Sequence, residues 1–170
     1  LAACGDINRN VMAPAAPYEK GSYPAARKLA SDIADVLAPK AAEITYLDLW
    51  VDGELKYAIK PSPEVKRNRK KQLNPGVFSG DNKEPLYGST YLPRKFKCAT
   101  TVPGDNSVDI LTHDIGLVTF TNKNGTLEGC NVYIGGGMGR THNLDTTFAR
   151  VADPIGFVEG QDILELVQSI

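Results

Sequence analysis

The stretch that decides the fold class of this chain is LVTFTNKNGTLEGCNVYI, residues 117–134. It holds two runs rich in β-branched and aromatic residues, 117–121 and 127–134, separated by a polar segment that contains Asn124-Gly125. Asn-Gly is a strong signal for a hairpin turn, because both residue types tolerate the left-handed backbone that such turns require. The stretch therefore predicts two strands joined by a hairpin.

The sequence around this hairpin predicts further strands and helices. Residues 22–37 place apolar side chains at three- and four-residue spacing and are followed by Pro39, which indicates an amphipathic helix. Asp52-Gly53 predicts a second hairpin. The other predicted elements are strands at 44–51, 54–59 and 94–102, a short helical stretch at 106–111, and helices at 146–151 and 161–170. Strands mixed with helices and joined by hairpins predict an α+β domain, with a mixed sheet and flanking helices.

The length of 170 residues predicts one domain over residues 1–170. Within it, residues 60–90 lose periodicity and collect Pro and Gly, which predicts a long loop of a kind usually functional or disordered. The basic run 66–71 lacks aromatic side chains on which bases could stack. This composition favours a solvated loop over docking of an acidic protein, and it gives a nucleic-acid-binding module no support.

The formal net charge of −1 hides an asymmetry between the two parts of the chain. Residues 1–100 hold 16 Lys and Arg against 11 Asp and Glu, and residues 101–170 hold 3 against 9. A basic first part suits an anionic ligand or an acidic partner, although charges spread over a solvated surface would look the same. No apolar run approaches the roughly 20 residues that cross a bilayer. The start at Leu1 shows no leader and suggests a piece of a longer protein.

Neither the cysteines nor the histidines predict a metal site. Cys4, Cys98 and Cys130 are odd in number and far apart, unlike a disulfide framework or an iron–sulfur motif. We expect reduced thiols, at least two of them in strands. His113 and His142 have no ligand spacing to each other or to the cysteines, so each is expected at the surface or in a hydrogen bond.

Two polar clusters in the first part of the chain could bind an anion. The first, CGDINRNV at 4–11, has the composition of a ligand-binding loop, and Arg9 offers a planar fork of donors for oxyanions. The second is YLPRKFK at 91–97. In a strand Lys95 and Lys97 share one face, with Phe96 on the other. Two like charges on one face require a reason, which is either a bound anion or protection of a sheet edge against aggregation.

A third cluster is the glycine run GGGMG at 135–139, which follows the predicted strand 127–134. Successive glycines let backbone N–H groups turn toward an anion and form a nest. The run fits neither the dinucleotide fingerprint nor the phosphate-binding loop, because the required last glycine and the Gly-Lys-Ser/Thr are absent. Arg140 beside the run favours carboxylates or phosphates as the ligand. The cluster therefore predicts an anion site.

Together the three clusters resemble the siroheme-dependent nitrite and sulfite reductase family, and most of all its sulfite reductase hemoproteins. The resemblance covers roughly half of the chain, in the family's order, at residues 4–14, 91–102, 106–118 and 131–154. It implies the siroheme/4Fe–4S fold in its first catalytic domain, and six-electron reduction of sulfite to sulfide on siroheme coupled to a 4Fe–4S cluster. It further implies ferredoxin as donor, the remainder of the reductase chain as partner, no nucleic acid or membrane partner, and the cytoplasm or the plastid stroma as location.

The resemblance also implies roles for individual residues. The residues that it makes catalytic, by binding the anion and supplying protons, are Arg9, Lys95 and Lys97. The residues that it places at the cofactor are Asn8, Arg94, Gly135, Gly136, Gly137, Met138 and Arg140. Plant-type nitrite reductases tend to carry asparagine at the position of Lys97, so lysine here points to sulfite.

Departures from the family pattern keep two alternatives open. The family's cluster cysteines come as two close pairs, which this sequence lacks, so the ligands of the cluster are expected outside it. A further arginine of the substrate pocket is expected before Leu1, and the isolated chain is expected to be inactive. A nitrite reductase of the same family, and a non-catalytic domain that binds a tetrapyrrole or an anion, both remain as alternatives.

Overall fold

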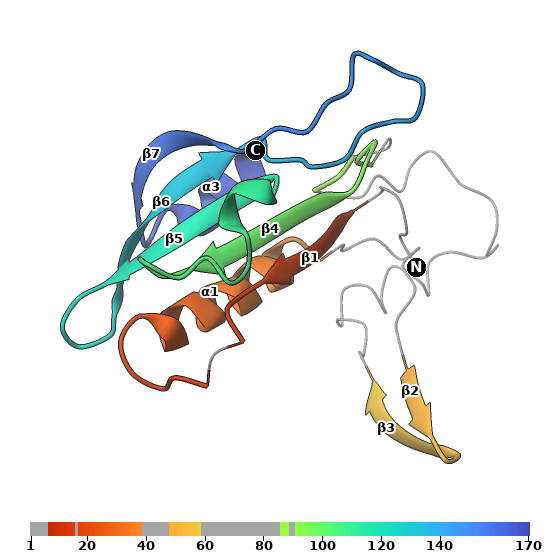
Figure 1. Cartoon of the computed structure of the whole chain (residues 1–170). Helices are drawn as coiled ribbons and strands as arrows, with labels where there is room; N and C mark the ends of the chain where they lie inside the picture. Colours follow the sequence, from red (N-terminus) through yellow and green to blue (C-terminus); the bar gives the residue numbers. More distant parts are fainter. Residues whose placement is uncertain (1–6, 16, 39–47, 59–85, 89–90) are drawn as a thin grey trace.

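The computed structural model describes residues 7–15, 17–38, 48–58, 86–88 and 91–170. It confirms the α+β class, with helices packed on one face of a five-stranded mixed sheet of order β1-β4-β5-β6-β7 (Figure 1). The strands of this sheet are β1 (Asn8–Met12), β4 (Phe96–Thr101), β5 (Ile115–Thr121), β6 (Leu127–Ile134) and β7 (Asp153–Glu159). The other elements are α1 (Tyr23–Val36), the 3-10 turn η1 (Ile110–Thr112), α3 (Ile163–Ser169) and a two-stranded sheet of β2 (Asp48–Val51) and β3 (Glu54–Ala58).

The strand directions bring several chain segments to one end of the main sheet. Strands β1, β4 and β5 run parallel, β6 is antiparallel to β5, and β7 is antiparallel to β6. The amino ends of the three parallel strands therefore lie beside the carboxyl end of β6 and the first residue of β7. We call this the amino end of the sheet and the other the carboxyl end. The loop 135–152 extends from the amino end, where β4 also begins (Figure 1).

The core lies between the sheet and its two helices. Helix α1 confirms the amphipathic pattern, because Leu29 and Ile33 are buried against the sheet. Ile163 of α3 joins the same cluster and is fully buried. The sheet contributes Cys98, Ile115, Leu117, Cys130 and Val132. These alternate positions along the strands face the helices, as the period of two requires.

Both predicted hairpins are present. Asp52 and Gly53 have φ of +52° and +78°, so both occupy the left-handed region between β2 and β3. The β5–β6 connection is longer than a two-residue turn. The side-chain oxygen of Asn122 accepts the N–H groups of Asn124 (2.9 Å) and Thr126 (3.0 Å), and this pair of hydrogen bonds closes the loop.

The sequence-based prediction of secondary structure was wrong in three regions. Residues 146–151 form turns and an isolated bridge between Arg150 and Gly137, not a helix. Strand β7 was missed because Pro154 and Gly156 weaken the strand pattern, although an edge strand tolerates both. The cluster 4–11 was predicted as a loop, yet Asn8–Met12 is the edge strand β1, whose polar residues satisfy their backbone by parallel pairing with β4.

Some predictions fall outside the described residues. These include nearly all of the long loop 60–90 with its basic run 66–71, and also Cys4. The single domain over residues 1–170 likewise stays a prediction. Among the residues that the structure does describe, no helix is long and apolar enough to cross a membrane.

Candidate functional site at the amino end of the sheet

Parallel pairing of β1 with β4 brings Arg9 close to Lys97 along the backbone. Asn8 pairs with Phe96 and Asn10 pairs with Lys97, so Arg9 is the extra residue of a bulge between these two pairs. Arg9 is exposed. Two predicted site residues that are almost ninety positions apart in sequence thus lie on adjacent strands.

The start of β4 separates apolar from cationic side chains, as predicted. Phe96 packs against the core cluster and Cys98 is fully buried, so both face the helices. Lys97 alternates with them and lies on the opposite face of the sheet. Arg94 and Lys95 precede the strand and are exposed. No described carboxylate forms an ion pair with Arg94, Lys95 or Lys97.

Asn8 holds the bulge in shape. Its side-chain nitrogen donates to the carbonyl oxygens of Phe96 (3.1 Å) and Asn10 (3.3 Å), because the reverse orientation would bring its own oxygen against these acceptors. Its backbone N–H donates to the hydroxyl of Tyr87 at 3.0 Å. The structure therefore gives Asn8 a role in fixing the backbone on both sides of Arg9, and a contact of Asn8 with a cofactor stays a prediction.

The glycine run follows β6, but its three first amides do not form the predicted nest. The N–H of Gly135 donates to Asp114 O (3.0 Å), that of Gly136 to His113 O (3.0 Å), and that of Gly137 to Arg150 O (2.8 Å). These amides are satisfied within the protein and are not turned toward a common ligand in this conformation, and a contact of the glycine run with a cofactor stays a prediction. The run acts as a structural connection at the amino end.

The structural reason for a glycine differs among Gly135, Gly136 and Gly137. Gly135 has φ of +88°, which a side chain disfavours. A Cβ on Gly136 would lie 2.4 Å from Leu111 O and 2.5 Å from His113 O, so close packing excludes any side chain there. Gly137 has neither reason, because a Cβ would meet no described atom within 4 Å and its φ is not positive. Open space beside Gly137 leaves room for a bound group.

The remaining predicted cofactor residues lie in the exposed loop after the glycines. Met138 is 56% exposed. The guanidinium of Arg140 forms an ion pair with Asp145 of the same loop at 2.5 Å. A carboxylate of a ligand would therefore compete with Asp145 for Arg140. The contacts of Met138 and Arg140 with a cofactor stay predictions.

No site residue was predicted in the segment 111–114, although the family resemblance covers it, and the site's other segments are bonded to this segment. Its carbonyl groups accept the amides of the glycine run and of Ala152, and the carboxylate of Asp114 accepts the N–H of Lys97 at 2.8 Å. The imidazole Nε2 of His113 lies 3.3 Å from Met12 Sδ of β1. His113 is thus a buried hydrogen-bonding residue, in line with its prediction. A carboxylate just before a strand was the only signal in the sequence, because the contact with Lys97 depends on the parallel β4–β5 register.

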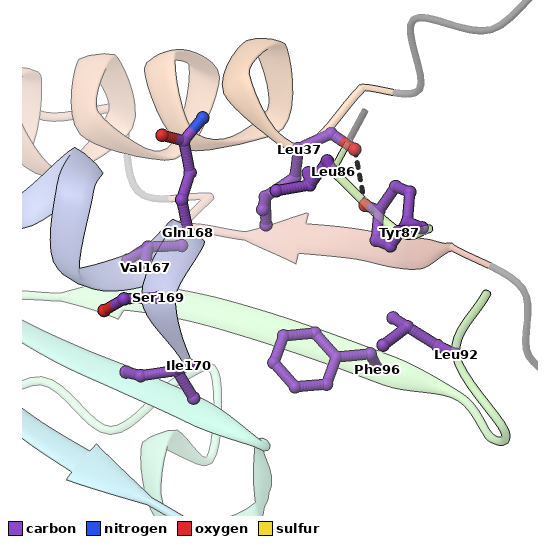
Figure 2. A pocket seen from close by; sticks show the side chains of 9 residues that line it. All are labelled: Leu37, Leu86, Tyr87, Leu92, Phe96, Val167, Gln168, Ser169 and Ile170. Carbon is purple, nitrogen blue, oxygen red and sulfur yellow. Dashed lines mark hydrogen bonds between the residues drawn. The ribbon is translucent and has the colours of Figure 1, made fainter. Parts of the chain in front are cut away.

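A cavity of about 210 Å³ lies on the other side of β4 and is distinct from the cationic site. Its lining is mainly apolar and contains none of the predicted site residues. The described residues that line it are Leu37, Leu86, Tyr87, Leu92, Phe96, Val167, Gln168, Ser169 and Ile170. Figure 2 shows the Tyr87 hydroxyl bonded to Leu37 O, at 2.5 Å. None of these described lining residues carries a positive charge, so the described lining offers nothing that would attract an anion.

Two cysteines are buried in strands, as predicted, and neither is reactive. Cys98 and Cys130 are free thiols with no exposed surface. Burial raises the pKa of Cys98 to about 12, with a further contribution from the Asp114 carboxylate, and it raises the pKa of Cys130 to about 11. Among the described residues no group of His, Cys, Asp and Glu could hold a metal ion. The described part of the chain thus offers no ligand set for an iron–sulfur cluster.

Comparison with known proteins shows the family. Residues 70–170 match the family model described as the nitrite and sulphite reductase 4Fe-4S domain. The whole chain is 54% identical, over 171 residues, to the sulfite reductase (ferredoxin) of Synechococcus elongatus and covers 27% of that protein. It is 42% identical, over 170 residues, to the sulfite reductase (NADPH) hemoprotein beta-component of Methylorubrum populi and covers 24% of it.

The chain therefore spans about a quarter of the length of these curated relatives. The mixed sheet agrees with the fold that the resemblance implied, and the family match includes β4, the segment 111–114 and the glycine run. The chain belongs to the nitrite and sulphite reductase 4Fe-4S domain family.

Proposed function

We propose that this chain forms part of a sulfite reductase that reduces sulfite to sulfide, with Arg9, Lys95 and Lys97 binding the anion and supplying protons. The observation that carries the proposal is the juxtaposition of Arg9 with Lys97 at the amino end of the parallel strands β1 and β4. Arg94 and Lys95 lie directly before that strand. One end of one sheet thus gathers four cationic side chains from two distant segments.

Electrostatics explains why such a cluster suits an anionic substrate. Like charges on neighbouring strands repel one another and are destabilising unless an anion compensates them. Lys95 and Lys97 have no described carboxylate as ion-pair partner, so they are available to a dianion such as sulfite. An ammonium group also carries protons that can move to oxygen as an S–O bond breaks. Binding and proton supply therefore follow from the same side chains.

Siroheme is typical of this family, and the residues at the amino end fit it. A carboxylate-edged macrocycle requires cations at its rim and space for its flat face. Arg94 and Arg140 provide guanidinium groups suited to carboxylates, and the open space beside Gly137 and the exposed Met138 provide an approach for an apolar surface. Siroheme, when bound, supplies the redox centre, while this chain orients the anion over it. The 4Fe–4S cluster would take its ligands from outside this chain.

Ferredoxin is the proposed electron donor. The relative named as a ferredoxin enzyme is 54% identical to this chain, against 42% for the NADPH hemoprotein component. The location in the cytoplasm or the plastid stroma remains a prediction.

The visible absorption spectrum of the full-length protein, recorded with and without sulfite, tests the proposal. We expect siroheme bands that shift on addition of sulfite. The variant Lys97→Ala should weaken sulfite binding about ten- to a hundredfold, the usual cost of losing a charge-assisted hydrogen bond. Lys123→Ala is the matched control, because Lys123 is an exposed lysine in the hairpin at the carboxyl end of the sheet, and it should leave the affinity unchanged.

Three outcomes would contradict the proposal. A full-length protein without a chromophore, made in cells that synthesise siroheme, would indicate a relative that has lost the cofactor. A shift produced by nitrite but not by sulfite would indicate the nitrite reductases. Equal sulfite affinity in the unsubstituted protein and Lys97→Ala would remove Lys97 from the anion site.

A further inference from the structure

The segment 111–114 joins the two halves of the proposed site through a few hydrogen bonds. His113 O and Asp114 O accept the N–H groups of Gly136 and Gly135, both at 3.0 Å, which fixes the glycine run. The Asp114 carboxylate accepts the N–H of Lys97 at 2.8 Å, which fixes the start of β4. A single residue, Asp114, is thus bonded to the glycine run through its backbone and to the anion-binding strand through its side chain.

The N–H of Lys97 depends on this carboxylate for its acceptor. The two carbonyl groups just before β5 accept from the glycine run, and the Lys97 N–H donates to the Asp114 carboxylate instead. The β4–β5 register pairs Cys98 with Ile115 and therefore places Lys97 beside Asp114. A backbone N–H without an acceptor is costly, and a carboxylate makes a stronger hydrogen bond with it than a neutral oxygen does.

The negative charge of Asp114 would otherwise oppose the function of the site. A carboxylate close to Lys97 disfavours a bound anion by direct repulsion. Its field reaches the start of β4, because it contributes to the raised pKa of the Cys98 thiol. The hydrogen bond that Asp114 accepts from the Lys97 N–H explains why an acidic residue stands at this position despite the repulsion.

We propose that Asp114 is a positioning residue of the anion site, whose hydrogen bond to the Lys97 backbone holds the lysine in register with the glycine run. The inference rests on the proposed function, since it assigns Asp114 to the site in which Lys97 binds sulfite. The Lys97 side chain starts from a backbone held on one side by Asn10 of β1 and on the other by Asp114. Loss of the carboxylate removes one of these two supports, and a displacement of about 1 Å can cost about a hundredfold in a catalytic site.

Two substitutions separate the hydrogen bond from the charge. Asp114→Asn keeps an oxygen that accepts from Lys97 but removes the charge, whereas Asp114→Ala removes both. Asp105→Ala is the matched control, because the Asp105 carboxylate accepts the Ser107 N–H at 2.7 Å at the carboxyl end of the sheet. The control removes two hydrogen bonds to a carboxylate, from the Ser107 N–H and from the Tyr23 hydroxyl, away from the site, and so it reports the effect of lost stability alone.

The experiment measures sulfite affinity from the shift of the siroheme bands in the full-length protein, and the exchange rate of the Lys97 amide by residue-resolved mass spectrometry. In Asp114→Ala we expect affinity about tenfold or more weaker and faster exchange at Lys97. In Asp114→Asn we expect slow exchange and an affinity equal to or tighter than that of the unsubstituted protein, because repulsion is removed. Asp105→Ala should change neither quantity.

Unchanged sulfite affinity in Asp114→Ala would overturn the inference, and so would an Asp114→Asn variant as weak as Asp114→Ala. A loss of affinity in Asp105→Ala equal to that in Asp114→Ala would also overturn it, since stability alone would then explain the effect. Failure of the proposed function would look different, because the unsubstituted protein would then show no sulfite-dependent shift. The exchange rate at Lys97 requires no sulfite and still reports whether Asp114 holds the strand.

Discussion

At both ends of the main sheet an aspartate carboxylate accepts a backbone N–H, but the surroundings of the two carboxylates differ. At the amino end the Asp114 carboxylate accepts the N–H of Lys97, and at the carboxyl end the Asp105 carboxylate accepts the N–H of Ser107. Asp105 also accepts the hydroxyl of Tyr23 at 3.0 Å. The Ser107 N–H is the main reason that the pKa of Asp105 lies below its ordinary value. At the carboxyl end the carboxylate therefore has two hydrogen-bond donors within the fold.

At the amino end, three cations have no carboxylate partner among the described residues. Lys97 has its backbone N–H satisfied by Asp114, but its side chain forms no ion pair with a described residue, and the same holds for Arg94 and Lys95. The difference shows that at the amino end a hydrogen bond holds the backbone of β4, while the cationic side chains on and before this strand have no described ion-pair partner. A fixed strand that presents a cationic side chain is what an anion site requires.

The largest effect on stability is expected for Gly136→Ala within the amino end. Its Cβ would lie 2.4 Å from Leu111 O, and neither backbone can yield without loss of the hydrogen bonds between the glycine run and segment 111–114. We expect a loss of about 2–3 kcal/mol in the free energy of unfolding, measured by denaturant titration.

Gly137→Ala is the control for that substitution, because its Cβ meets no described atom within 4 Å. We expect a change in unfolding free energy of less than about 0.5 kcal/mol. The siroheme content per protein should nevertheless fall if the cofactor occupies this space. Full siroheme content in Gly137→Ala would show that the space beside this glycine does not adjoin the cofactor.

The two buried thiols predict a loss of stability at alkaline pH. The pKa values of Cys98 and Cys130 are raised from 9.0 to about 12 and about 11, so the folded state keeps these protons after the unfolded state has lost them. Stability should therefore fall between pH 9 and 11, by about 1.4 kcal/mol per pH unit for each thiol. Denaturant titrations of the Cys130→Ala variant at pH 8 and pH 10 should show a smaller loss than the unsubstituted protein. An equal loss would assign the pH dependence to other groups.

A smaller loss of stability than in Gly136→Ala is expected at the carboxyl end, for Asn122→Ala. The side-chain oxygen of Asn122 accepts two N–H groups of the hairpin, and their loss in an exposed loop should cost about 1 kcal/mol of unfolding free energy. Sulfite affinity should not change. A loss of sulfite affinity in this variant would break the distinction between the two ends of the sheet.

The sequence predicted those parts of the fold that depend on local pattern. The spacing of Leu29 and Ile33 identified α1, and the alternation of Phe96, Lys97 and Cys98 placed Lys97 on the face opposite the core. Each of these signals lies within a few residues of the chain, where periodicity and turn chemistry are informative.

The parts that could not be predicted depend on distant partners. Strand β1 appeared as a loop because its polar residues find backbone partners only in β4, and β7 contains Pro154 and Gly156, which only an edge strand tolerates. The glycine run suggested an anion nest, but its amides are bonded to His113, Asp114 and Arg150. The role of Asp114 follows from the parallel β4–β5 register, which no local pattern encodes.

A crystal structure of the full-length protein with sulfite bound would test the central claim most directly. We predict that the anion lies at the amino end of the sheet, within hydrogen-bonding distance of Lys97 and Arg9, with the siroheme carboxylates near Arg94 or Arg140. An anion bound at the carboxyl end near Asp105, or at the amino end but out of reach of Lys97, would contradict the account.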